Sequence, residues 1–163
     1  MVDANSTRII LEAEVKIARD WAARNGIQFE WLPEVLEIRV ELRQGDSQER
    51  FYLKGQFPDY RELPPKWFFV DCSWSETTER VNAPRGVQTR FGPSIFNEHN
   101  LRPVICAHFN RLAYQQEGGL HQDWTDEASW LSIGGQYVRA TNLAEMLQII
   151  VRDFRYTNER LAA

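Results

Sequence analysis

The amino-acid sequence predicts an α+β fold in which two helices pack on a small antiparallel sheet. Three observations indicate this class. An apolar stripe at helical spacing lies near the start of the chain, segments that alternate apolar and charged residues follow it, and a second helical stripe lies near the end. The length of 163 residues is typical of one domain, so we treat residues 1–163 as a single domain.

The first predicted helix covers residues 7–24. Its apolar residues recur at i, i+3, i+7, i+8 and i+11, and we expect this stripe to face the core: Ile10, Ala13, Ile17, Ala18 and Trp21. Ser6 or Thr7 is expected to cap the start, and Asn25-Gly26 favours a stop. The outer face carries both acidic and basic residues, as solvated helix surfaces do.

Three antiparallel strands are expected next, in the form of a meander. In residues 35–43, Leu36, Ile38, Val40 and Leu42 alternate with charged residues, which predicts one buried and one wet face. Residues 44–47 favour a turn, and residues 49–55 are predicted to return as the second strand. A loop bounded by prolines then leads to a third strand over residues 66–72.

A long irregular region and a closing helix complete the predicted fold. Residues 73–139 lack strong periodicity and contain all three histidines, and long stretches of this kind often carry function. The final helix is predicted over residues 142–160, capped by Thr141 or Asn142. Its apolar stripe comprises Leu143, Met146, Leu147, Ile150, Val151 and Phe154.

Composition and charge exclude several classes of protein. The net charge is −4 and the basic residues alternate with acidic ones, so we expect no nucleic-acid partner. No signal-peptide pattern and no apolar run of membrane-spanning length is present, so we expect no membrane association. The two cysteines, Cys72 and Cys106, are expected to be free thiols in a reduced cytoplasmic protein.

Two segments of the chain resemble the ubiquitin-conjugating enzyme family. That family carries an aromatic-Pro-x-x-Tyr-Pro-x-x-Pro-Pro-Lys pattern before an aromatic strand, and this chain has Phe57-Pro58-Asp59-Tyr60 followed by Leu63-Pro64-Pro65-Lys66. Downstream, the family's His-Pro-Asn-Ile, active-site cysteine, tryptophan and Thr-Leu helix start are similar to pieces found here in the same order: Pro93-Ser94-Ile95-Phe96, Val104-Ile105-Cys106, Trp124 or Trp130, and Thr141-Asn142-Leu143. The resemblance implies a ubiquitin-conjugating-enzyme-like fold over nearly the whole chain, with residues 73–139 as a long active-site loop.

The resemblance also implies a function and partners. Cys106 would accept a ubiquitin-like protein from an activating enzyme as a thioester and pass it to an amine of a protein acceptor, without a cofactor or metal. Gly92-Pro93-Ser94 replaces the family's His-Pro-Asn, and the spacing around Cys106 is longer. These departures resemble divergent bacterial relatives, whose operons encode an activating enzyme, a ubiquitin-like protein and a deconjugating protease, and several of which act in phage defence.

The chemistry of thioester transfer suggests helpers for Cys106. The nucleophile is a thiolate, and the tetrahedral intermediate requires a donor for its oxyanion. Because the family asparagine is missing, His108 or His121 is a candidate oxyanion donor or loop support, and so is an amide: Asn97, Asn100 or Asn110. Asp123, with Asp126 beside Trp124, is a candidate to orient or deprotonate the attacking lysine. Each of these residues could equally be an ordinary loop residue, and Cys72 is expected to pack in the core.

Three other interpretations remain open. A zinc site built from Cys106, His99, His108 and His121 is disfavoured, because a C-x-H spacing lacks the paired short spacings of structural zinc sites. The same fold could also serve as a non-catalytic binder of ubiquitin-like proteins or as a scaffold of a conjugation complex. A Cys-His hydrolase using Cys106, His121 and Asp123 is the third interpretation.

Overall fold

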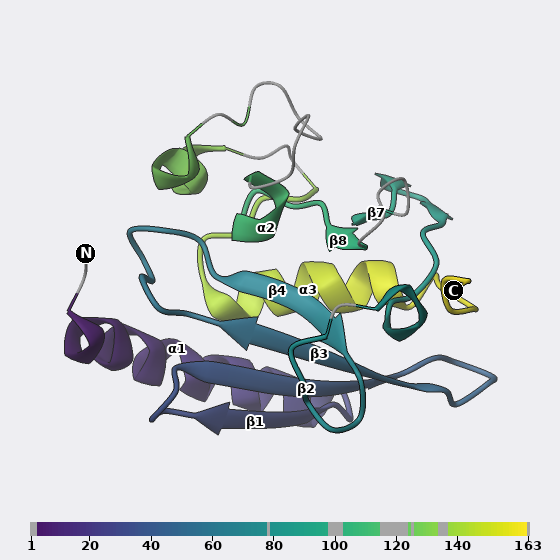
Figure 1. The fold of residues 1–163 in the computed structure, drawn as a ribbon, viewed down its shortest axis with the longest axis horizontal. Coiled ribbons are helices and arrows are strands. Elements are labelled where there is room, and N and C mark those ends of the chain that lie inside the picture. Colours follow the sequence, from purple (N-terminus) through teal and green to yellow (C-terminus); the bar gives the residue numbers. More distant parts are fainter. Residues whose placement is uncertain are drawn as a thin grey trace.

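The computed structural model describes residues 3–77, 79–97, 103–114, 124, 126–133 and 137–162. Its fold is α+β, with an N-terminal helix, a four-stranded antiparallel sheet and a C-terminal helix (Figure 1). This confirms the predicted class. The elements, in chain order, are α1 (Ala4–Arg24), β1 (Gln28–Leu32), β2 (Glu37–Arg43), β3 (Arg50–Gln56), β4 (Lys66–Val70), η1 (Arg80–Asn82), β5 (Gln88–Thr89), β6 (Gly92–Pro93), β7 (Phe96–Asn97), β8 (Val104–Ile105), α2 (Arg111–Tyr114), η2 (Glu127–Ser132) and α3 (Leu143–Phe154).

The sheet is a meander with the strand order β1-β2-β3-β4. The predicted inward residues Ile38, Val40 and Leu42 of β2 are buried, as the alternation indicated. Strand β1 was not predicted, and it pairs antiparallel with β2 so that Phe29 lies opposite Val40. Its alternation spans only five residues, which is too short to stand out from a loop in sequence alone.

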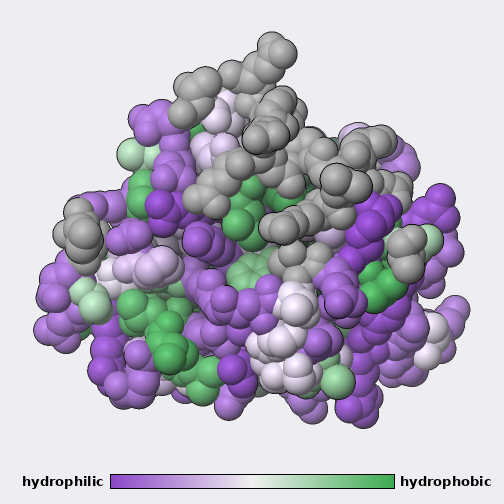
Figure 2. Space-filling model, in the orientation of Figure 1, coloured by the Kyte–Doolittle hydropathy of each residue, from purple (hydrophilic) through white to green (hydrophobic). Residues whose placement is uncertain are grey.

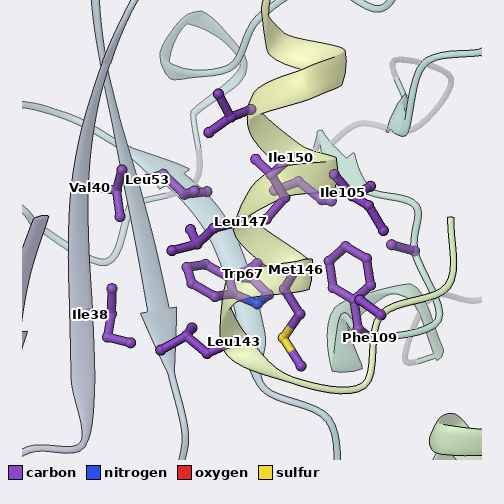
Figure 3. Close-up of a cluster of buried hydrophobic side chains, with 14 of the residues drawn as sticks. Ile38, Val40, Leu53, Trp67, Ile105, Phe109, Leu143, Met146, Leu147 and Ile150 are labelled. Carbon is purple, nitrogen blue, oxygen red and sulfur yellow. The ribbon is translucent and has the colours of Figure 1, made fainter. Parts of the chain in front are cut away.

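Helix α3 lies across one face of the sheet and carries the predicted apolar stripe into the core (Figures 1 and 3). The Asn142 side chain accepts a hydrogen bond from the backbone N–H of Glu145 at 3.0 Å, so the predicted asparagine cap is confirmed. The helix ends at Phe154 rather than at residue 160. After Phe154 the chain leaves the helical path, because the backbone of Arg160 forms an isolated antiparallel bridge with Pro84.

Helix α1 buries a face that overlaps the predicted one only at Ala18, with Trp21 packed against the edge of the core. Thr7, Leu11, Val15, Ala18 and Ala22 are its buried residues. Ile10 and Ile17, predicted to be inside, are 37% and 62% exposed. The helix carries two stripes at helical spacing, and the small side chains at 18 and 22 let one of them approach α3 closely. The predicted N-terminal cap is also wrong, since the helix starts at Ala4 and the Thr7 hydroxyl donates to the Tyr60 carbonyl at 2.7 Å. The predicted stop is confirmed, because the helix ends at Arg24 with Asn25 as its C-cap.

The second face of the sheet is covered by the chain's own loop after β4. The ring of Trp74 lies 5.3 Å from that of Tyr52 and 5.4 Å from the guanidinium of Arg39. Figure 1 shows this loop crossing β3 and β2. Glu37 and Lys54 lie on this face, beneath the loop, and are only 6% and 3% exposed, although the alternation predicted a wet face.

Cys72 begins that loop and is exposed, so the prediction that it packs in the core was wrong. The strand β4 ends at Val70, two residues before the cysteine, and the chain turns there. Asp71 holds the turn, because its carboxylate accepts hydrogen bonds from the hydroxyls of Ser73 and Ser75 at 2.6 and 2.8 Å. These bonds lower the pKa of Asp71 to about 2.

Large hydrophobic side chains are also exposed on α1 and on the turn between β1 and β2. Ile9, Ile10 and Ile17 of α1 and Val35 of the turn are each more than a third exposed. Figure 2 shows hydrophobic residues gathered where α1 and this turn lie, at the lower left of the view. Among the described residues, no helix has the length and apolar character needed to cross a membrane.

Candidate functional site

Cys106 follows a short two-stranded ribbon that stands apart from the main sheet. Strands β7 and β8 pair antiparallel, with Phe96 opposite Ile105. The backbone N–H of Cys106 extends this ladder by donating to the carbonyl of Ile95 at 2.6 Å. The backbone N–H of Cys106 is thus held by the neighbouring strand, while the residue remains partly exposed.

Helix α3 fixes the ribbon from below. Asp153, which is 1% exposed, accepts a hydrogen bond from the backbone N–H of Ile95 at 2.9 Å. Ile95 therefore connects a buried carboxylate of α3 to the backbone of Cys106: its N–H donates to Asp153 and its carbonyl accepts from the N–H of Cys106. Ile105 and Phe109, on either side of the cysteine, insert among the α3 side chains Met146 and Ile150 (Figure 3).

Asn110 joins the Cys106 segment to the main sheet. Its fully buried amide accepts from the Trp67 N–H at 2.9 Å and donates to the Trp67 carbonyl at 3.1 Å. It also donates to the carbonyl of Ile105 at 2.8 Å. The two hydrogen bonds that the Asn110 amide donates both go to backbone carbonyls. The amide therefore supports the loop and has no N–H directed at a reacting oxyanion.

His108 is completely buried and both of its ring nitrogens contact the backbone. Nδ1 lies 2.8 Å from the Trp130 carbonyl, which requires Nδ1 to be the donor, and Nε2 accepts from the N–H of Ala140 at 3.0 Å. Burial lowers the pKa of His108, which favours this neutral tautomer. The ring therefore links the Cys106 segment to residues 130 and 140, and this geometry suits loop support better than oxyanion donation.

The thiol of Cys106 lies in a desolvated environment. Burial raises its pKa to about 11, so the protonated form dominates near neutral pH. A thiol of high pKa is a strong nucleophile when ionised and a poor leaving group once acylated. Cys106 is thus a largely protonated thiol rather than a permanently ionised thiolate.

Several predicted residues cannot be placed beside Cys106. His99, Asn100, His121 and Asp123 lie outside the described residues, and the side chain of Asn97 does so too. Asp126 is exposed and caps η2, since its carboxylate accepts from the N–H of Ala128 at 3.0 Å. Within the described ranges, no three His, Cys, Asp or Glu side chains are grouped as metal ligands.

A glycine determines how closely the preceding chain can approach the ribbon. A Cβ atom on Gly86 would lie 2.3 Å from the carbonyl oxygen of Phe96 in β7. Only glycine allows the chain to pass this backbone at such a distance.

A separate hollow of about 300 Å³ lies at the ends of α1 and α3, and its lining residues do not include the Cys106 segment.

No protein-family model, no curated protein and no solved structure matches this chain. The fold and the site geometry are therefore the basis for any functional proposal. Asp153, which sequence reasoning did not single out, and Trp130, one of the two candidates for the family's tryptophan, hold the Cys106 segment. Asp153 gave a signal, because it is a lone acid beside Phe154 at the end of an otherwise apolar stripe. Its partner Ile95 is 58 residues away, so the pairing itself could not be foreseen.

Proposed function

We propose that this protein is a ubiquitin-conjugating-type carrier that holds a ubiquitin-like protein as a thioester on Cys106. The proposal takes its partners from the sequence resemblance: an activating enzyme, a ubiquitin-like protein and a protein acceptor. It extends to the finer fold class, a ubiquitin-conjugating-enzyme-like fold, and to a bacterial conjugation system of the kind that acts in phage defence. The reaction class is acyl transfer between thiols and then to an amine.

One observation carries the proposal: the chain that follows Cys106 contacts residues 57–66, the other segment that resembles the family. Arg111, five residues after Cys106, forms an ion pair with Asp59 at 3.2 Å and donates its backbone N–H to Pro65 at 2.8 Å. Asn110 adds the bonds to Trp67, just after Lys66. A resemblance built from two unrelated stretches would not require them to share a site.

The proposed reaction has two steps, loading and transfer. In loading, the Cys106 thiol loses its proton, its sulfur attacks the activating enzyme's thioester carbon, and the activating enzyme's thiolate leaves. In transfer, a neutral amine attacks the Cys106 thioester, a C–N bond forms, and the Cys106 thiolate departs and regains a proton. A leaving thiol with a raised pKa slows hydrolysis and favours a strong nucleophile such as an amine.

The roles of the helpers follow from their contacts. Asn110 and His108 are positioning residues, because the polar atoms of both side chains are bonded to backbone groups. We retain His121 and Asp123 as proposed helpers from the sequence, with His121 as oxyanion donor or loop support and Asp123 as the group that orients the attacking amine.

A second candidate is a non-catalytic member that binds a ubiquitin-like protein or scaffolds a complex. The raised pKa of Cys106 and the occupied ring nitrogens of His108 favour it over an enzyme with an activated thiolate. This candidate predicts complex formation without any covalent adduct.

Incubation with the activating enzyme, ATP and the ubiquitin-like protein separates the two candidates. On a non-reducing gel, the carrier gives an adduct that thiol reagents remove, that is absent in Cys106→Ala and that persists in Cys72→Ala. Complex formation without an adduct, using genuine partners, would contradict the carrier and favour the binder.

A further inference from the structure

An arginine–aromatic cluster lies on the loops next to the Cys106 ribbon; it comprises Arg90, Phe91, Tyr137 and Arg152. Arg139 follows Tyr137 by two residues, and its guanidinium donates to the Leu131 carbonyl at 3.3 Å. The ring of Phe91 is contacted by two guanidiniums, that of Arg90 at 4.7 Å and that of Arg152 at 4.4 Å. The Tyr137 ring lies 5.4 Å from the Phe91 ring, and Tyr137 is 50% exposed. The aromatic rings therefore hold cations at an accessible surface.

The cluster carries more positive charge than its neighbours neutralise. Arg152 is paired with Asp153 at 2.8 Å, and Asp153 is buried. Arg90 and Arg139 are exposed, and neither forms an ion pair within the described part of the chain. On a protein whose net charge is −4, this is a local cationic surface that an incoming anion would stabilise.

Two chains of contacts place the cluster beside Cys106. Asp153, which holds Arg152, also accepts the N–H of Ile95, and the Ile95 carbonyl accepts the N–H of Cys106. From the other side, Ala140 follows Arg139 directly and donates its backbone N–H to His108, two residues after the cysteine. The hairpin of β5 and β6 and the segment 137–140 therefore both adjoin the Cys106 ribbon.

The length of an extended peptide links this cluster to the proposed reaction. An acyl carbon bound to Cys106 ends a polypeptide tail, and an extended tail advances about 3.3 Å per residue. Residues about three to five positions before that carbon therefore lie about 10 to 16 Å from it along the extended tail, within reach of the loops that adjoin the Cys106 ribbon. An acceptor lysine is a cation, so an uncompensated pair of arginines repels it and favours the tail as occupant.

We infer that this cluster recognises an acidic residue in the C-terminal tail of the ubiquitin-like protein, with Arg90 and Arg139 as the specificity-determining residues. The inference rests on the proposed function, since it presupposes that Cys106 receives the tail. The aromatic rings of Phe91 and Tyr137 hold the tail's backbone and the arginines select its charge. The preference is electrostatic, so it weakens as ionic strength rises.

Chemically activated peptides test the inference without the native partner. In a Cys72→Ala background, acetylated five-residue peptide thioesters of a small alkylthiol are offered to Cys106, with Glu, Gln or Lys at the third and fourth positions from the C-terminus. Transfer forms a thioester at Cys106 and releases the alkylthiol, and intact-mass spectrometry follows its rate. We expect the Glu peptide to load about three- to tenfold faster than the Gln peptide, and the Lys peptide to load more slowly than both.

Charge reversal supplies the control. Arg90→Glu should abolish the preference, and so should Arg90→Ala with Arg139→Ala, because the charges at the two positions then sum to zero. Arg90→Glu with Arg139→Glu should invert the order of the Glu and Lys peptides. Arg24→Glu, a charge change on α1 equal to that of Arg90→Glu, should keep the preference. Equal loading by all three peptides, or a preference unchanged by Arg90→Glu, overturns the recognition surface and leaves the carrier intact. Failure of every peptide to load Cys106 contradicts the carrier itself, and the inference with it.

Discussion

The side-chain amide of Asn110 is bonded to both the N–H and the carbonyl of Trp67, at 2.9 and 3.1 Å. One side chain thus continues the hydrogen bonding of the sheet where no further strand pairs with the start of β4. Because the same amide also holds the Ile105 carbonyl, Asn110 connects the residue before Cys106 to the main sheet.

Replacing Asn110 by alanine should destabilise the protein strongly. The change leaves the buried N–H and the carbonyl of Trp67 without the Asn110 amide as partner, which costs about 2–4 kcal/mol of unfolding free energy. Urea unfolding measures the loss. Asn82→Ala is the matched control, because the amide nitrogen of Asn82 has no hydrogen-bond partner in the described structure. If both variants lose equal stability, the role assigned to Asn110 is wrong.

The buried His108 should make stability depend on mildly acidic pH. Burial lowers its pKa in the folded state, so below the ordinary value of 6.5 the unfolded chain binds a proton that the folded chain does not. The unfolding free energy should therefore fall with falling pH, by at most about 1.4 kcal/mol per pH unit from this group. The difference in unfolding free energy between wild type and His108→Gln, measured from pH 5 to 8, isolates the contribution of His108. Parallel pH profiles for the two proteins would show that His108 is not held neutral.

The raised pKa of Cys106 predicts how its thiol reacts. Since the thiolate is the reactive form, alkylation of Cys106 by iodoacetamide should accelerate about tenfold per pH unit up to a pKa of about 11. The measurement uses Cys72→Ala, so that only Cys106 is modified. A rate that levels off below pH 9 would instead indicate an activated thiolate.

The fold was largely predictable because periodicity records burial. The stripe of α3 and the alternation of β2 each match one buried face, so both were assigned correctly. In α1 two apolar stripes compete, and only the packing against α3 decides between Leu11 with Val15 and Ile10 with Ile17. The wet face of the sheet was misjudged because Trp74, distant in sequence, covers it.

The site was less predictable because its supports are long-range. Cys106 could be singled out from its neighbours, yet Asn110 reaches Trp67 across 43 residues and Ile95 reaches Asp153 across 58. Periodicity carries no information on such pairs. His108 was singled out as a histidine near a cysteine, and its two backbone contacts, with Trp130 and Ala140, depend on the packing of the later chain.

Intact-mass spectrometry after loading tests the central claim most directly. With the activating enzyme, ATP and the ubiquitin-like protein, the carrier should gain the mass of that protein less one water, and hydroxylamine should remove it. Cys106→Ser should form an ester that resists thiols but not alkali, and Cys72→Ala should load like the wild type. A mass gain that survives Cys106→Ala, or no gain with partners that load another carrier, would contradict the assignment of the thioester to Cys106.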